Sequence, residues 1–173
     1  VIGFLGLVPA AILLFAVTFG ALVSTTFDAV GGWEAGSGRI ESVTPSVNEF
    51  SRLTADSSFD VEIRTGEAFG VVVRTDDNLL DDVQASVSGE TLTLSLRGNY
   101  RDVTLEATVT VPNSALSAIS TSGAATVVSQ GQLASGPFGV DASGASRVIL
   151  RLESNNLTVD ASGASTIEVT GAG

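Results

Sequence analysis

The sequence predicts an all-β fold, a right-handed β-helix-like stack of rungs of about 20 residues each, preceded by one N-terminal transmembrane helix. Three observations lead to this prediction. The segment VDASGAS at residues 140–146 recurs letter for letter at residues 159–165. Apolar and polar residues alternate along most of the chain after Arg39, which is the period of β-strands. The first 23 residues contain no charged side chain.

The composition restricts the classes of function. The 173 residues include 19 acidic residues against eight arginines and no lysine, which gives a formal net charge of −11. This charge opposes binding to nucleic acid, so we expect no nucleic-acid partner. Cysteine and histidine are absent, which removes disulfides, thiolate zinc sites and the usual general base near neutral pH. We therefore expect no cofactor, no metal and no enzymatic activity.

Residues 1–24 are expected to form a transmembrane helix or an uncleaved signal anchor. An apolar helix of this length measures roughly 34 Å, which is enough to cross a hydrocarbon core of about 30 Å. A cleaved secretory signal is the alternative, because Gly20, Ala21 and Ser24 are small. Residues 25–38 are expected to be a Gly/Ser-rich linker, followed by the folded domain at residues 39–173. This order predicts a single-pass protein of the cell envelope whose C-terminal domain is extracytoplasmic.

Several runs after Arg39 predict strands because apolar residues occupy every second position. These runs are residues 59–63, 69–73, 92–96 and 103–111. Turn-forming residues flank them, at 65–67, 88–90, 97–99 and 112–114. The acidic stretch 76–82 is interpreted as a solvated turn between two strands. A calcium site is the alternative, because carboxylate oxygens suit that cation, but the spacing matches no EF-hand loop.

The repeats place equivalent residues on successive rungs. Looser copies lie at residues 119–127 and 53–61, ahead of the two identical segments. Each later copy contains Ser-Gly-Ala, which we expect to form a tight corner, because glycine allows successive backbones to approach closely. The predicted corner residues are Ser122, Gly123, Ser143, Gly144, Ser162 and Gly163.

Asp141 and Asp160 occupy equivalent positions in the two identical copies. We expect them to belong to an outward-facing ladder of polar side chains. A catalytic pair of carboxylates, as in retaining glycosidases, is the alternative. Like charges stacked so closely repel each other, which favours the solvated ladder.

Several motifs together resemble the head GIN domain family, which is described as auto-transporter adhesins. They are residues 62–67, 75–81, 89–94 and 109–113, followed by the Ser-Gly-Ala repeats. The resemblance covers about residues 36 to 173 in matching order. It implies a secreted or envelope-anchored bacterial protein with a β-helix-like fold and no established catalytic residues. The chain lacks the lipobox cysteine of many members, and the family pattern predicts further rungs beyond Gly173.

The leading functional hypothesis is a non-enzymatic adhesin or surface-binding module anchored in the envelope. Rows of polar side chains at fixed intervals suit an extended ligand, such as a polysaccharide or a cell-surface protein. One alternative is a β-helical carbohydrate-active enzyme that uses carboxylates alone. Another is a structural or sensory ectodomain. The expected membrane contact is through the N-terminal helix.

Overall fold

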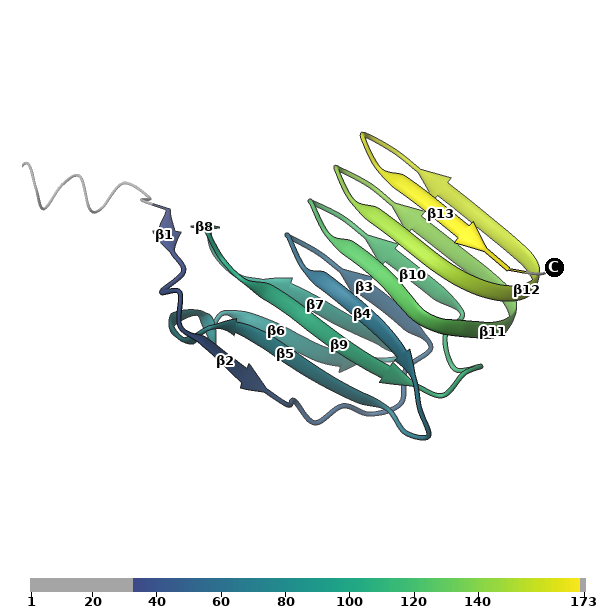
Figure 1. The fold of residues 1–173 in the computed structure, drawn as a ribbon, viewed down its shortest axis with the longest axis horizontal. Helices are drawn as coiled ribbons and strands as arrows, with labels where there is room; N and C mark the ends of the chain where they lie inside the picture. Colours follow the sequence, from purple (N-terminus) through teal and green to yellow (C-terminus); the bar gives the residue numbers. More distant parts are fainter. Residues whose placement is uncertain (1–32, 172–173) are drawn as a thin grey trace, which may run out of the picture. The chain divides into compact units, whose positions relative to one another are not determined.

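The computed structural model describes residues 33–171, and most of these residues lie in β-strands (Figure 1). The strands of the first half are β1 (Glu34–Ala35), β2 (Ile40–Val43), β3 (Arg52–Ala55), β4 (Asp60–Thr65), β5 (Gly70–Asp76), β6 (Val83–Ser88) and β7 (Thr91–Leu96). Those of the second half are β8 (Tyr100–Arg101), β9 (Leu105–Val111), β10 (Ala118–Thr121), β11 (Thr126–Ala142), β12 (Arg147–Ala161) and β13 (Thr166–Thr170). A single turn of 3-10 helix, η1 (Asp77–Leu79), follows β5.

Strands form where apolar and polar residues alternate in the sequence. In β9 every second side chain, from Leu105 to Val111, is buried, and the side chains between them are half-buried. β3, β4 and β7 also alternate between buried and more exposed side chains. Successive side chains of a strand point to opposite faces of the sheet. Each of these four strands therefore contributes one apolar row to the core and one more polar row to the surface.

Eleven strands belong to one sheet, which curls into a half barrel and so forms two facing layers (Figure 1). The first layer consists of β6, β7, β3, β10 and the C-terminal halves of β11 and β12. The second layer consists of β2, β5, β9, β4, the N-terminal halves of β11 and β12, and β13. β11 and β12, at 17 and 15 residues, are long enough to bend from one layer into the other. β1 and β8 form a separate two-stranded sheet.

The hydrophobic core fills the space between the two layers. Leu92, Leu53, Ile119 and Val140 are successive register partners on four neighbouring strands, and each is at most 2% exposed. Burying one such side chain contributes about 1.5–3 kcal/mol. Continuous ladders of this kind, on both layers, are therefore the main source of stability.

Four tight turns stack along one edge of the curled sheet. They lie at residues 56–59, 122–125, 143–146 and 162–165, and each connects a strand of the first layer to a strand of the second. A backbone amide of each later turn donates a hydrogen bond to a carbonyl oxygen of the turn before it. The donors and acceptors are Ala124 to Ser57 at 2.6 Å, Ala145 to Gly123 at 2.7 Å, and Ala164 to Gly144 at 2.7 Å.

The environment of Gly144 explains why glycine occupies these turns. Its φ is +73°, and a Cβ added there would lie 2.5 Å from the carbonyl oxygen of Gly123. A side chain would thus force the two turns apart. Ser57, in the first turn, also has a positive φ of 64°. The strands beneath it, β7 and β9, are connected by the longer segment 97–104 rather than by a tight turn, so a Cβ is accommodated there.

The predicted fold class, a right-handed β-helix-like stack of rungs, is wrong for the part of the chain that the structure describes. The two identical segments do pair in parallel register, with Val140, Asp141 and Ala142 beside Val159, Asp160 and Ala161. The other end of the sheet is antiparallel, because β6 pairs with β7 and β5 pairs with both β2 and β9. Alternation with period two identifies a strand but not its direction, so these hairpin-like pairings could not be distinguished from rungs.

The predicted transmembrane segment, residues 1–24, lies outside the described residues, as does most of the predicted linker at 25–38. Within residues 33–171 there is no helix with the length and apolarity needed to cross a bilayer. Residues 35–173 group into one compact unit by their contacts.

Replacing Gly144 with alanine is expected to destabilise the fold by about 2–4 kcal/mol, because the new Cβ meets the backbone of Gly123 and adopts an unfavourable φ. Urea unfolding measures the change. Ser57→Ala is the matched control, because it retains a Cβ at a positive φ where no tight turn lies beneath, and should change stability by less than about 0.5 kcal/mol. Equal losses in the two variants would contradict the stacking explanation.

Candidate functional site

An open groove with a volume of about 790 Å³ crosses the outer face of the first layer. Its lining comes from five neighbouring strands, in the order β7, β3, β10, β11 and β12. Neighbouring strands of a sheet lie about 4.8 Å apart, so the groove extends across roughly 19 Å of the sheet. It therefore runs across the strands rather than along them.

Two rows of side chains line the groove, because the strands pair in register. The first row consists of Thr91, Arg52, Ala118, Gly139 and Thr158. The second row consists of Thr54, Ser120, Asp141 and Asp160. Small residues occupy both row positions on β10, Ala118 and Ser120, and the first-row position on β11, Gly139. Charged side chains lie on either side of them, with Arg52 on β3 and with Asp141 and Asp160 on β11 and β12.

The charged side chains of the groove have no partner among residues 33–171. In the described part of the chain, Arg52, Asp141 and Asp160 make no ion pair and no side-chain hydrogen bond, and all three residues are exposed. Asp141 and Asp160 are direct register partners on adjacent strands. Two carboxylates in this position repel each other. The groove therefore combines one unpaired cation with a pair of unpaired anions.

A second hollow, on the outer face of the second layer, differs because four of its five charged side chains, all except Asp60, form ion pairs with each other. Arg64 forms an ion pair with Glu62 at 2.8 Å, and Arg74 forms one with Glu106 at 2.5 Å. The hydrogen bond from Arg64 lowers the pKa of Glu62. Since these charged groups already have partners, they have less to offer a ligand than those of the groove.

The predicted corner residues lie in the stacked turns and do not line the groove. Gly123, Gly144 and Gly163 have φ values of +69°, +73° and +70°. Their turns are bridged by hydroxyl groups as well as by the backbone, as when Ser143 donates to the carbonyl oxygen of Thr121 at 3.2 Å. Of the residues named from the sequence, Asp141 and Asp160 alone line the groove.

Sequence reasoning missed the remaining groove residues, above all Arg52. It lies one residue before the earliest and most divergent copy of the repeat, so no similarity drew attention to it. Aligning the register partners Leu53 and Ile119 would have placed Arg52 beside Ala118. The repeat pattern therefore indicated the position of Arg52, but a single arginine on a strand does not form a recognisable motif.

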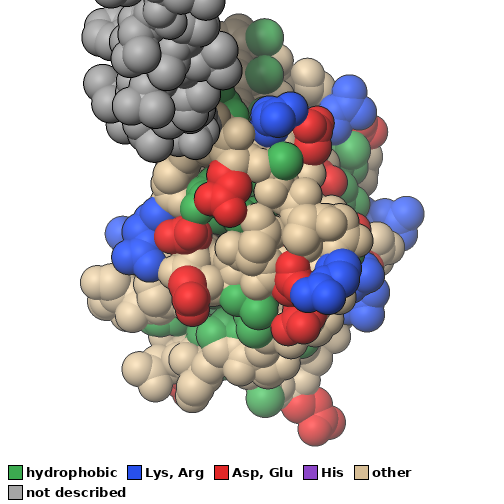
Figure 2. Space-filling model, turned by 90° about the vertical axis from the view of Figure 1, so that its left-hand side faces the viewer, with side chains coloured by type: hydrophobic (Ala, Val, Ile, Leu, Met, Phe, Trp, Pro, Cys, Tyr) green, Lys and Arg blue, Asp and Glu red, His purple; other side chains and the backbone are tan. Residues whose placement is uncertain are grey.

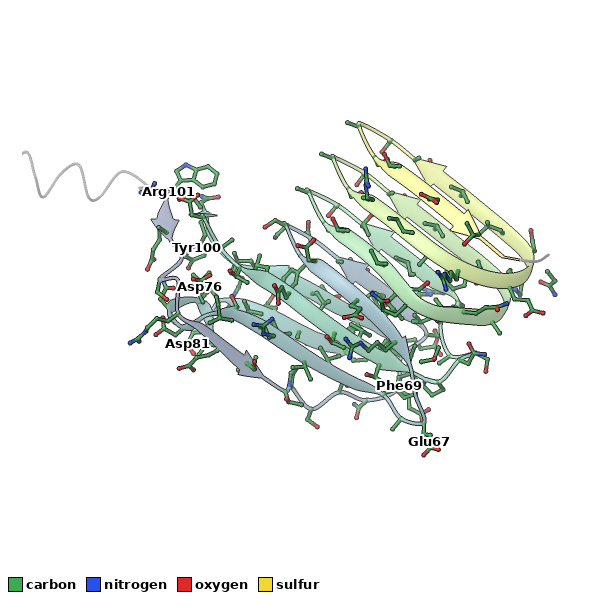
Figure 3. The ribbon with its side chains drawn as sticks, viewed as in Figure 1. Glu67, Phe69, Asp76, Asp81, Tyr100 and Arg101 are labelled. Atoms are coloured by element: carbon green, nitrogen blue, oxygen red, sulfur yellow. The ribbon has the colours of Figure 1, made fainter. Side chains whose placement is uncertain are left out.

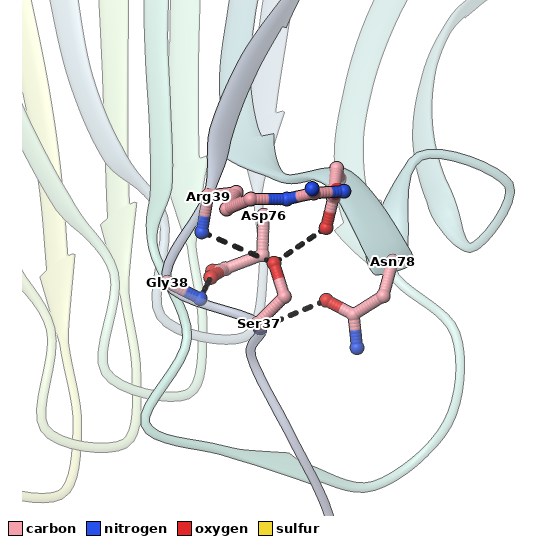
Figure 4. A network of polar contacts seen from close by, with 6 residues as sticks. Ser37, Gly38, Arg39, Asp76 and Asn78 are labelled. Carbon is pink, nitrogen blue, oxygen red and sulfur yellow. Dashed lines mark hydrogen bonds and ion pairs between the residues drawn. The ribbon is translucent and has the colours of Figure 1, made fainter.

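The acidic stretch 76–82 is a structural clamp rather than a fully solvated turn (Figure 4). Asp76 is 1% exposed, and its carboxylate accepts hydrogen bonds from the backbone amides of Gly38 at 2.6 Å and Thr104 at 2.8 Å. It thereby fixes two loops to the end of β5. Asp82 accepts a hydrogen bond from the hydroxyl of Tyr100. Figure 3 shows Asp76, Asp81 and Tyr100 on the same side of the unit, whereas Glu67 and Phe69 lie on the other.

The neighbouring Asp77 has partners of its own. Its carboxylate accepts hydrogen bonds from the hydroxyl of Ser37 and the guanidinium of Arg39, and these bonds lower the pKa of Asp77. On the side of the unit that Figure 2 shows, acidic and basic side chains are interspersed. Among residues 33–171, no group of three or more acidic side chains is arranged to hold a metal ion.

Replacing Asp76 with asparagine should destabilise the protein by about 1–3 kcal/mol, because the amide can accept only one of the two backbone hydrogen bonds and leaves a buried N–H unsatisfied. Chemical denaturation measures the loss. Asp81→Asn makes the same change at an exposed side chain and should lower the stability by less than about 0.5 kcal/mol. If Asp81→Asn were as harmful, the clamp at Asp76 would not be the cause.

Replacing Asp160 with asparagine should raise the Tm at low ionic strength, because it removes the repulsion from Asp141. The gain should shrink toward zero in about 1 M salt, where the Debye length falls to about 3 Å. Glu168→Gln is the matched control, because it removes one exposed negative charge whose register partner is the apolar Ile149. A gain of the same size in both variants would mean that the net charge, and not the pairing of Asp141 with Asp160, is responsible.

Three solved structures share this fold. One from Parabacteroides merdae, named "putative adhesin", has a TM-score of 0.71 at 20% identity over 80% of this chain and 59% of its own. A second from Bacteroides fragilis has a TM-score of 0.71 at 21% identity and covers 80% and 66%. A third from Parabacteroides distasonis has a TM-score of 0.72 at 23% identity and covers 80% and 59%. The chain thus spans less than two thirds of the length of each, and at these identities the likeness establishes the fold alone.

Sequence comparison identifies the family. No curated protein sequence matches the chain. The family model described as "Putative auto-transporter adhesin, head GIN domain" matches residues 49–173, which is more than half of the chain. The resemblance seen in the sequence motifs is therefore confirmed. The chain belongs to this head GIN domain family.

Proposed function

We propose that this chain is a non-enzymatic binding module of the adhesin type, which holds an extended polymer in the groove across β7, β3, β10, β11 and β12. Two rows of side chains in strand register carry the proposal, and all of their members except Ala118 and Gly139 are polar. They repeat at the spacing of the strands, about 4.8 Å, and therefore offer contacts at regular steps along a polymer. Each contact is weak, and affinity arises from the number of contacts made together.

The family supports a place at the cell surface. Its description is "Putative auto-transporter adhesin, head GIN domain", and the three solved structures compared above are each named "putative adhesin". We accordingly place the domain outside the cytoplasm, where the ligand would be a polysaccharide or a protein of another surface. The charge of −11 is compatible with this role and disfavours anionic surfaces as general targets.

Asp141 and Asp160 suggest a second candidate function, that of a glycosidase that uses two carboxylates. Their direct pairing on adjacent strands is the observation that favours it. A general acid, however, needs a carboxyl group that its surroundings keep protonated, usually by burial. Both of these residues are exposed. The binding role therefore accounts for the groove with fewer requirements, and unchanged polymer length after incubation with the chain would favour it.

The groove can be blocked without disturbing the core. A Cβ added at Gly139 would meet only the Cβ of Ala118, at an ordinary distance of 3.8 Å. In a glycan-array experiment with the full chain, we expect Gly139→Gln to reduce binding of any captured polymer by about tenfold or more, because a loss of 1.4 kcal/mol or more in binding corresponds to that factor.

Gly136→Gln is the matched control. Gly136 lies three positions earlier in the same strand, outside the groove lining, and a Cβ there meets nothing within 4 Å. This variant should bind like the parent chain, and both variants should keep the parent Tm. Equal binding by Gly139→Gln and the parent would contradict the groove as the binding site. If the parent chain bound no glycan on the array, a structural or sensory role would be favoured.

A further inference from the structure

We infer that the groove binds a zwitterionic polysaccharide, whose anionic group contacts Arg52 and whose ammonium group contacts the pair formed by Asp141 and Asp160. This inference rests on the proposed binding function and names its ligand class. It follows from the separation of opposite unpaired charges within one groove. It also depends on the hydroxyl-rich surface between them.

Arg52 provides the anion site. It is the single basic residue of the groove lining, and it is exposed on β3 with Thr91 and Ala118 as its register partners. Neither partner competes for its charge. A guanidinium presents several N–H donors in a plane that matches a carboxylate or phosphate. Because the chain as a whole carries a charge of −11, this local cation is the one point in the groove where an anion is attracted.

Asp141 and Asp160 provide the cation site. Their side chains extend from adjacent strands on the same face, and they make no ion pair or hydrogen bond within residues 33–171. Their mutual repulsion lowers the stability of the free protein. An ammonium group placed between them relieves that repulsion and interacts with both carboxylates. Groups that cost stability in the unbound protein in this way are typical of functional sites.

The two sites are separated by a floor of small residues. Between β3, which carries Arg52, and β11, which carries Asp141, lies β10 with Ala118 and Ser120. Two strand spacings correspond to about 10 Å, and Asp141 lies two residues further along the strands than Arg52, so the two positions are roughly 12 Å apart. A ligand that satisfies both ends must therefore carry opposite charges separated by about that distance, which a polymer of alternately charged units provides.

The surface between the charged ends favours sugar over peptide. Thr54 and Ser120 present hydroxyl groups in the floor, and Thr158 presents one at the rim, so they can exchange hydrogen bonds with sugar hydroxyls. The strands β3, β10 and β11 are each paired on both sides, so a peptide cannot be added to the sheet within the groove.

The experiment compares four oligosaccharides of matched length with the full chain by isothermal titration calorimetry at low salt. Carboxymethyl-chitosan carries both charges, its N-acetylated form carries the anion alone, chitosan carries the cation alone, and dextran is neutral. We expect the zwitterionic oligomer to bind more tightly than either singly charged one by about threefold to fivefold, which is the worth of one exposed ion pair. The preference should weaken as salt is added.

Two variants separate the contributions of the two ends. In Arg52→Gln, the zwitterionic oligomer should bind no better than chitosan. In the double variant Asp141→Asn with Asp160→Asn, it should bind no better than the N-acetylated form. The matched controls are Arg147→Gln and Glu168→Gln, which remove exposed charges on the outer face of the other layer and should preserve the preference.

Several results would overturn the inference. If dextran bound as well as the zwitterionic oligomer and Gly139→Gln blocked both, the binding function would stand and the zwitterionic ligand class would fall. If an alternating Glu-Lys peptide bound more tightly than the oligosaccharides, the polysaccharide class would fall. If no oligomer bound, and no array ligand were blocked by Gly139→Gln, the ligand class and the proposed function would fall together.

Discussion

The structure depends on the close approach of its stacked turns. At three successive steps a backbone amide of one turn donates to a carbonyl oxygen of the turn before it, at 2.6–2.7 Å. This distance leaves no room for a side chain, which is why glycine occupies the later turns. These stacked turns then fix the pairing register of the strands that they connect. Equivalent residues then lie side by side on neighbouring strands, as apolar ladders inside and polar rows outside, and the groove is a consequence of the outer rows.

The sequence carried much of this arrangement in its repeats. The identical segments at 140–146 and 159–165 correctly indicated neighbouring parallel strands, and alternation located most of the strands. The antiparallel end was missed because period-two alternation in segments such as 83–88 does not encode the direction of a strand. The burial of Asp76 was missed because its two donors, the amides of Gly38 and Thr104, are brought to it only by tertiary structure. Arg52 became a candidate only when β3 was seen beside β10.

Similar neighbouring residues stabilise the core of these strands but cause charge repulsion in the groove on their outer face. Inside, identical neighbours are favourable, because stacking Ile119 on Val140 buries apolar surface on both. Outside, identical neighbours bring Asp141 against Asp160 and create repulsion. A sequence repeat that places similar apolar residues side by side in the core therefore also places identical charged residues side by side on the surface. In the proposed binding role, the resulting carboxylate pair is the source of binding specificity, and Arg52 is the opposite charge that orients the ligand.

The groove thus depends on the pairing register of β11 with β12, and a disulfide experiment measures this register directly. The chain has no cysteine, so one introduced pair gives an unambiguous result. Cysteines that replace Asp141 and Asp160 lie on adjacent strands, within the Cα separation of roughly 4.4–6.8 Å that a disulfide requires. The account predicts rapid cross-linking of this pair under mild oxidation, and little cross-linking when the second cysteine replaces Thr158, which faces the same way two positions earlier. Preferential cross-linking of the Asp141 and Thr158 positions would contradict the register, and with it the rows that form the groove.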